Sequence, residues 1–181
     1  MINTTTDNVE FAQQILTLVA ADMNGQDRAY VIDALAWVPV DERVNVVRHT
    51  QTLVTKDMNG RDRAKVVTVL ARMGAGKRAR FIQQSRIFMT EGMNGHEWAH
   101  VIDTLARTPV DDRADIIRYA LAFVTEDMNG YDRACVISTF ARVAADDRVK
   151  FIRQAIALVT EDMTGCGRVN VITILAKEKT K

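Results

Sequence analysis

Apolar residues recur along this chain at the spacing of amphipathic helices. Val31 and Ile32 precede Leu35 by four and three positions, which places the three side chains on one face of an α-helix. After a short turn, Val46 and Leu53 lie seven positions apart in a second run of the same kind. The two runs predict two helices joined by a turn, each with one face that has to be buried.

This two-helix pattern belongs to an internal repeat that opens on Met-(Asn/Thr)-Gly. The opening residues are 35 positions apart and are Met23, Met58, Met93, Met128 and Met163. The full copies occupy residues 23–57, 58–92, 93–127 and 128–162, and half copies occupy residues 7–22 and 163–181. We therefore expect one repeat domain over residues 1–181.

The first helix of each copy has a recognisable start. An asparagine is followed three residues later by an acid, as in Asn24 and Asp27 or Asn129 and Asp132, which is similar to a capping box. The asparagine oxygen can accept a hydrogen bond from a free backbone N–H, and the helix dipole favours the acid. We interpret Met-Asn-Gly as a helix boundary.

The helix lengths decide how the copies can be arranged. First and second helices of about 12 and about 16 residues would be about 18 and 24 Å long. One such hairpin cannot bury its apolar face, whereas stacked hairpins cover one another at spacings of about 8 to 10 Å. The sequence thus predicts an all-α fold, a right- or left-handed α-solenoid of about ten helices.

Composition narrows the class of protein. The 24 basic residues are balanced by 23 acidic ones, so no net field favours nucleic acid or a membrane surface. The N-terminus lacks a signal-peptide pattern, and no apolar run approaches the roughly 18 residues of a membrane span. Two cysteines are too few for a disulfide framework, so we expect free thiols and a reducing, cytoplasmic environment without membrane insertion. No motif requires a cofactor, and none is expected.

Residues 96 to 100, His-Glu-Trp-Ala-His, match the HExxH motif of zinc metalloproteases. Glu97, however, stands at the capping position that aspartate occupies in the other full copies, and Trp98 replaces an arginine and is expected to pack at the helix start. A protease needs a third ligand and a substrate cleft, which a variation in one copy of a repeat does not supply. We therefore expect a protein that is not an enzyme.

A weaker chemistry remains open at the same place. His96, His100 and Asp103 are spaced so that they share one outward helix face. They are a candidate for a weak surface metal site, and the alternative is that they are ordinary solvated side chains.

One stripe of the first helices differs between copies while the apolar stripe is constant. It comprises the eighth, eleventh, twelfth and fifteenth positions of each copy, with the fourth position one turn earlier. Solenoids build recognition surfaces from such stripes, and aromatic residues and arginine are common interface anchors. The alternative is that exposed positions vary because nothing constrains them. The predicted partner-binding face comprises Gln26, Tyr30, Asp33, Trp37, Arg61, Lys65, Arg72, His96, His100, Arg107, Tyr131, Cys135 and Arg142.

Two columns of basic residues predict different roles. A column that could follow phosphates as a ladder comprises Arg72, Arg107, Arg142 and Lys177. A second column, in the first turn of the second helix, comprises Arg43, Arg78, Arg113 and Arg148. Because the helix dipole disfavours a cation there, the second column is expected to pair with neighbouring acids.

The chain resembles helical-hairpin repeat proteins, such as the tetratricopeptide, pentatricopeptide and HEAT repeats, in architecture. The 35-residue period and residues 32–36, Ile-Asp-Ala-Leu-Ala, are similar to pentatricopeptide repeats, which bind single-stranded RNA. The base-reading position of that family falls on alanine in all four full copies, so its RNA code does not carry over. Tetratricopeptide repeats, typically peptide binders, are one residue shorter, and their Trp-Leu-Gly-Tyr pattern is absent.

These observations favour a binding module. We expect a scaffold that presents the variable stripe to a protein or peptide, and the alternative is a nucleic-acid-binding repeat protein that uses the Arg/Lys ladder.

Overall fold

The computed structural model describes residues 4–19, 21–89 and 92–179, and this part of the chain is all-α. It forms ten helices and no strand, which confirms the predicted fold class. The helices are α1 (Thr4–Leu18), α2 (Gly25–Ala36), α3 (Val40–Leu53), α4 (Gly60–Ala71), α5 (Ala75–Arg86), α6 (Gly95–Arg107), α7 (Val110–Phe123), α8 (Gly130–Arg142), α9 (Ala145–Leu158) and α10 (Gly165–Lys179).

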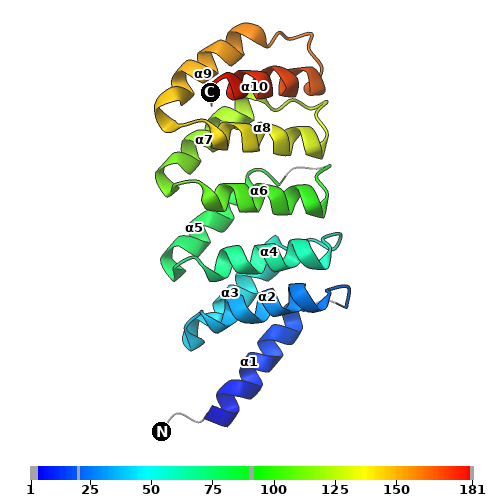
Figure 1. The fold of residues 1–181 in the computed structure, drawn as a ribbon, viewed down its shortest axis with the longest axis vertical. Coiled ribbons are helices and arrows are strands. Elements are labelled where there is room, and N and C mark those ends of the chain that lie inside the picture. Colours follow the sequence, from blue (N-terminus) through cyan, green and yellow to red (C-terminus); the bar gives the residue numbers. More distant parts are fainter. Residues whose placement is uncertain (1–3, 20, 90–91, 180–181) are drawn as a thin grey trace. The chain divides into compact units, whose positions relative to one another are not determined.

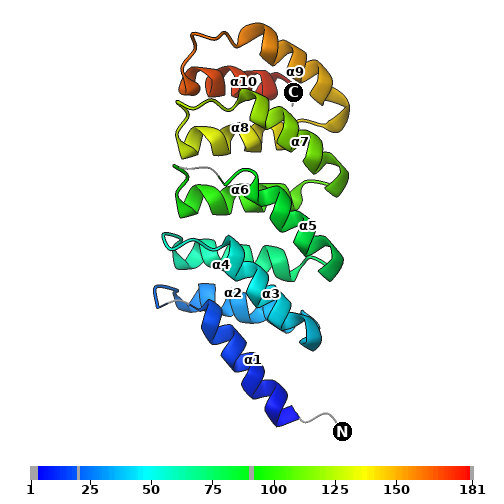
Figure 2. The same cartoon turned by 180° about the vertical axis from the view of Figure 1, so that it is seen from behind.

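The chain divides into two compact units, Met1–Arg86 and Ile87–Lys181. In the first unit, α2 and α4 lie side by side in one layer (Figure 1), and α1, α3 and α5 form the other (Figure 2). In the second unit, α6, α8 and α10 form one layer, and α7 and α9 the other. Each unit is thus a solenoid-like array. The expectation of one repeat domain stays a prediction.

The apolar stripe of the first helices forms the core of each unit. Leu35 and Leu70 in the first unit, and Leu105 and Phe140 in the second, occupy one repeat position and are 0% exposed. In the second unit, Phe140 also packs edge-on against Phe151, with 5.2 Å between ring centroids. The 3.6-residue periodicity therefore identified most of the buried face, but it was wrong for Ile32, which is 44% exposed.

The asparagines cap the first helices as predicted. The side-chain oxygen of Asn24 accepts from the Asp27 N–H at 2.8 Å, and the equivalent bonds of the other full copies are 2.9 to 3.0 Å long. In the third full copy a return bond, from the Asn94 N–H to Glu97 Oε2 at 2.8 Å, completes a capping box. The glutamate of the HExxH sequence is therefore the acidic member of a capping box.

Glycine in Met-Asn-Gly has a second cause, which lies in the packing of successive copies. In the first unit, a Cβ added to Gly60 would lie 2.7 Å from the Cα of Met23, the first residue of the preceding copy. In the second unit, a Cβ on Gly165 would lie 3.1 Å from the Met128 Cα. A Cβ on Gly25 would meet nothing within 4 Å. Glycine therefore allows the methionine backbone of one copy to approach the next helix start.

The arginine column of the second helices caps the preceding helix. Arg78 is 2% exposed, and its Nε donates to the Leu70 carbonyl near the end of α4 at 2.9 Å, where the helix dipole favours a cation. Its Nη1 lies 2.8 Å from Glu42 Oε2 of the preceding copy. This ion pair confirms the predicted pairing with acids, and the acid belongs to the preceding copy.

Candidate partner-binding face

The predicted face begins in the first unit with two exposed aromatic side chains of α2. Trp37 is 83% exposed and Tyr30 is 54% exposed. The Gln26 amide donates to the Tyr30 hydroxyl at 3.1 Å, which holds the phenol along the helix surface. Trp37 is the C-cap residue of α2, at the repeat position that Arg72 occupies after α4. The copies therefore offer different chemistry at the same place in the fold.

The charged residues of the first unit are only partly available for binding. Lys65 lies 3.3 Å from the carboxylate of Asp62, which is itself buried. Arg61 and Arg72 are exposed, as is Asp33 on α2. The exposed face of this unit thus combines two aromatic rings with two guanidinium groups and a carboxylate.

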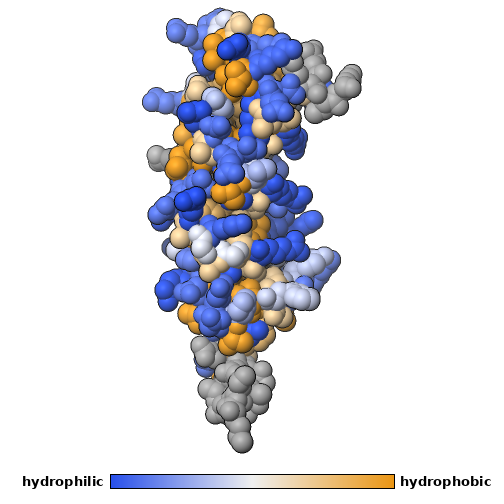
Figure 3. Space-filling view, turned by 90° about the vertical axis from the view of Figure 1, so that its left-hand side faces the viewer, coloured by the Kyte–Doolittle hydropathy of each residue, from blue (hydrophilic) through white to orange (hydrophobic). Residues whose placement is uncertain are grey.

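In the second unit the predicted face is carried by α6 and α8. Tyr131 is 65% exposed, and His96, His100 and Arg142 are also exposed. Arg107 is exposed as well, but its guanidinium lies 3.0 Å from Asp103 one turn earlier, so part of its charge is compensated. Figure 3 shows one side of the molecule, on which hydrophobic residues are scattered among hydrophilic ones. In this unit the candidate face consists of the exposed side chains named above.

The prediction that the whole stripe is exposed is wrong in its middle. Ala34 in the first unit is 8% exposed, and Ser138 and Thr139 in the second are 5% and 7% exposed. The reason is that neighbouring first helices pack side by side: Ser138 Oγ lies 2.9 Å from His100 Nε2 and 3.4 Å from Thr104 Oγ1. Packing between copies leaves mainly the ends of the stripe open.

Cys135 is half-buried rather than part of an open surface. Its thiol and that of Cys166 are free, as predicted. Burial raises the pKa of the Cys135 thiol, so this group stays protonated near neutral pH. We therefore assign Cys135 to the support of the face, beneath the exposed ring of Tyr131.

The weak metal site is not formed by the residues proposed for it. Asp103 pairs with Arg107, and the ring of His100 is hydrogen-bonded to Ser138. In the part of the chain that the structure describes, no three His, Cys, Asp or Glu side chains are grouped to hold a metal ion. Trp98 is 1% exposed, which confirms that it packs at the helix start. Glu97 and Trp98 of the HExxH sequence thus have structural roles in helix capping and core packing.

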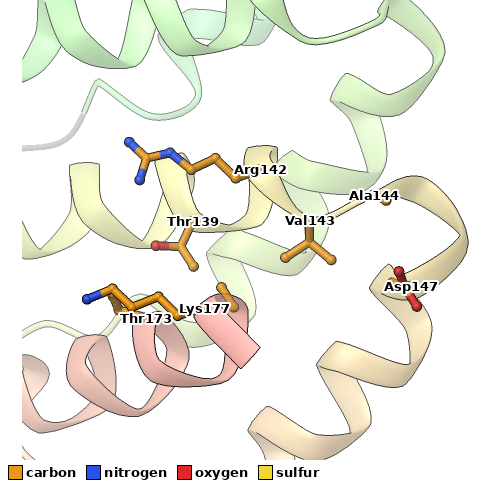
Figure 4. A pocket seen from close by; sticks show the side chains of 8 residues that line it. Thr139, Arg142, Val143, Ala144, Asp147, Thr173 and Lys177 are labelled. Atoms are coloured by element: carbon orange, nitrogen blue, oxygen red, sulfur yellow. The ribbon is translucent and has the colours of Figure 1, made fainter. Parts of the chain in front are cut away.

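A cavity of about 210 Å³ in the second unit was not predicted from the sequence (Figure 4). Residues of α8, α9 and α10 and of the turn between α8 and α9 line it. Arg142 and Lys177 extend along one side, while Asp147 lies on the other. No local motif marks this place, because the three helices come together only in the folded unit. The lining residues are Thr139, Arg142, Val143, Ala144, Asp147, Thr173, Ala176 and Lys177.

The fold is that of a helical-repeat protein assembled from two-helix copies, without assignment to a narrower family. No family model matches the chain, and neither a curated protein nor a solved structure was found to match it. None of the helices in the described ranges is both long and apolar enough to cross a membrane.

Proposed function

We propose that this protein is a non-enzymatic scaffold that binds a protein or peptide through the exposed parts of the first helices. The observation that carries the proposal is the 83% exposure of Trp37 at the end of α2. Burial of a tryptophan side chain in an interface removes a large apolar surface from water and so contributes strongly to the free energy of binding. Tryptophan is enriched among the interface residues that dominate binding.

The neighbourhood of Trp37 supports the same function. Tyr30 lies two turns earlier on α2 and is held by Gln26. Rigid aromatic side chains lose little conformational entropy on binding, so a pair of them on one helix is suited to anchor a partner. Exposed Arg61 on the neighbouring α4 and exposed Arg72 at the C-cap of that helix add charge at the rim, which favours a partner segment with acidic residues beside an apolar one.

Affinity capture with quantitative mass spectrometry tests this function. Wild-type protein is compared with the Tyr30→Ala/Trp37→Ala double variant, and Val44→Ala is the control because Val44 is an exposed apolar residue of the other layer. We expect partners that are retained by wild type and by the control to be lost from the double variant, with the melting temperature unchanged. Equal retention by all three proteins would show that Tyr30 and Trp37 do not contribute to partner binding.

The second candidate is nucleic-acid binding, and one observation favours it. Arg142 and Lys177, from neighbouring first helices of the second unit, are exposed and extend in the same direction (Figure 4). Two adjacent cations can contact successive phosphates. Three arginines of the second-helix column cannot contribute, because Arg78, Arg113 and Arg148 are buried against carbonyl groups.

Gel shifts with mixed RNA and DNA distinguish the two candidates. A phosphate-binding ladder predicts shifts that weaken steeply with salt and disappear when Arg72, Arg107 and Arg142 are replaced by Glu. Absence of a shift at low salt would end this alternative and leave the protein-binding function.

A further inference from the structure

The cavity in the second unit corresponds to a place that is filled between the third and fourth full copies. Asp112 near the start of α7 has the repeat position of Asp147 near the start of α9. Beside Asp112 lies the beginning of α9, and Arg148 Nη2 donates to Asp112 Oδ2 at 3.0 Å. Beside Asp147 lies the cavity. The first turn of α9 therefore occupies the place beside Asp112, whereas the equivalent place beside Asp147 is a cavity.

The same arrangement occurs independently in the first unit. Arg78, in the first turn of α5, reaches Glu42 of the preceding copy at 2.8 Å. Glu42 again has the repeat position of Asp147. Two interfaces within the molecule thus show the same chemistry: a helix start whose arginine binds the carboxylate at this position. Within the part of the chain that the structure describes, the carboxylate of Asp147 has no ion-pair partner.

Two apolar residues of α9 and α10 are more exposed than their counterparts in earlier copies. Leu158 on α9 is 50% exposed, whereas Leu53 and Phe123 at the same repeat position are 0% and 4% exposed. Ile174 on α10 is 58% exposed, whereas Thr139 at the equivalent position of α8 is 7% exposed. The position of Leu158 is buried in these earlier copies, and the position of Ile174 is buried at Ala34 and Thr139 and half-buried at Thr104.

We propose that this cavity and its apolar surround bind a helix of a partner protein that carries an arginine in its first turn and bulky apolar residues three and four positions later. The arginine enters the cavity and binds Asp147, as Arg148 binds Asp112. The apolar residues have the spacing of Phe151 and Ile152 after Arg148, which are 0% and 9% exposed. The occupant is specified by continuity with the two interfaces that the chain already contains, in which an arginine binds the carboxylate at this repeat position. This inference does not rest on the function proposed for the aromatic face.

A peptide with the sequence of residues 144–162 is the probe, because it contains the helix that fills the equivalent place. Its residues 150 and 154, both exposed in the protein, are replaced by a lactam-linked pair so that the free peptide is helical, which circular dichroism verifies. Binding to the full chain is measured by fluorescence anisotropy. We expect saturable binding that weakens by about tenfold or more with Asp147→Asn, the size of effect expected for loss of a charged hydrogen bond.

A double-mutant cycle tests whether the arginine of the peptide contacts Asp147 directly. Replacing the arginine of the peptide by glutamine is expected to weaken binding to the wild-type chain but to cause little further loss with Asp147→Asn. Asp146→Asn is the matched control, because Asp146 is exposed in the same turn of α9, and it should leave binding unchanged.

Three results overturn the proposal. The first two are absence of saturable binding by the verified helical peptide and equal binding to wild type and Asp147→Asn. The third is concentration-dependent self-association of the protein, seen by sedimentation velocity, that Asp147→Asn abolishes, because the occupant would then be a second copy of this chain.

Discussion

Arg148 and Asp112, one repeat apart, form a hydrogen-bonded ion pair with 3.0 Å between Nη2 and Oδ2. At the same time the Nε of Arg148 donates to the Val143 carbonyl at 3.0 Å, so one side chain both closes the turn of its own copy and holds the preceding one. Arg78 and Glu42 repeat the relationship in the first unit. A cation that local reasoning would judge unfavourable at a helix start is thus stabilised by the copy before it.

Asp112→Asn is expected to lower the free energy of unfolding by about 1–3 kcal/mol, because Arg148 is buried and loses a charged acceptor. Asp111→Asn is the matched control, since Asp111 is exposed in the same helical turn and its loss changes the helix dipole interaction similarly. Urea denaturation of both variants measures the difference. Equal destabilisation would show that the ion pair contributes nothing beyond the dipole effect.

Gly60→Ala is expected to be destabilising by about 1–3 kcal/mol, because the new Cβ would lie 2.7 Å from the Met23 backbone and would push the copies apart. Gly25→Ala adds the same atom at the same repeat position, where nothing lies within 4 Å. We expect this control to be neutral or slightly stabilising, since alanine favours the helix. Thermal denaturation of both variants checks the contrast, and a similar loss in both would contradict the interlocking role of glycine.

The two tryptophans are expected to report on opposite environments. Trp37 is 83% exposed and Trp98 is 1% exposed. Trp37→Phe should therefore leave a blue-shifted emission that acrylamide quenches weakly, and Trp98→Phe should leave a red-shifted emission that acrylamide quenches strongly. The reverse order of quenching would place the wrong tryptophan in the core.

Trp98→Arg restores the residue that other copies have at this position, yet it is expected to destabilise the protein. The indole is fully buried, so a guanidinium in its place would be a charged group among buried neighbours. We expect this loss of free energy of unfolding to exceed the stabilisation gained by restoring the common residue. In the other copies this arginine donates to the carbonyl of the opening methionine, as Arg133 does to Met128 at 3.0 Å. Chemical denaturation measures the change in the free energy of unfolding. An increase would show that the third copy can accommodate an arginine at this position as the other copies do.

Acid sensitivity is expected to depend on Asp127. The neighbouring Thr125 hydroxyl and the Gly165 N–H, which donates to Asp127 Oδ2 at 2.7 Å, lower the pKa of the Asp127 carboxyl. A lowered pKa in the folded state contributes stability that is present above the ordinary aspartate pKa of about 3.9 and is lost as the pH falls through the lower, folded value. The free energy of unfolding of Asp127→Asn should therefore fall less steeply below pH 4 than that of wild type. Glu126→Gln is the neighbouring control, and parallel pH profiles for wild type and Asp127→Asn would contradict this assignment.

The local rules of helix formation were sufficient for much of the fold. The 35-residue period is visible in the sequence itself. The capping asparagines and the buried position of Leu35 follow from the spacing of residues three or four positions apart, which the sequence alone gives. The capping role of Glu97 was predictable for the same reason, because a repeat shows what its position does in other copies.

The tertiary structure alone decided how neighbouring copies meet. It buried Ser138 in the middle of the predicted stripe, gave Arg148 a carboxylate from the preceding copy, and left the cavity beside Asp147. These contacts join side chains about one repeat apart, so they depend on the offset and angle at which two helices pack. Helical periodicity specifies which face is buried, but the offset between packed helices arises only when side chains of both copies interdigitate.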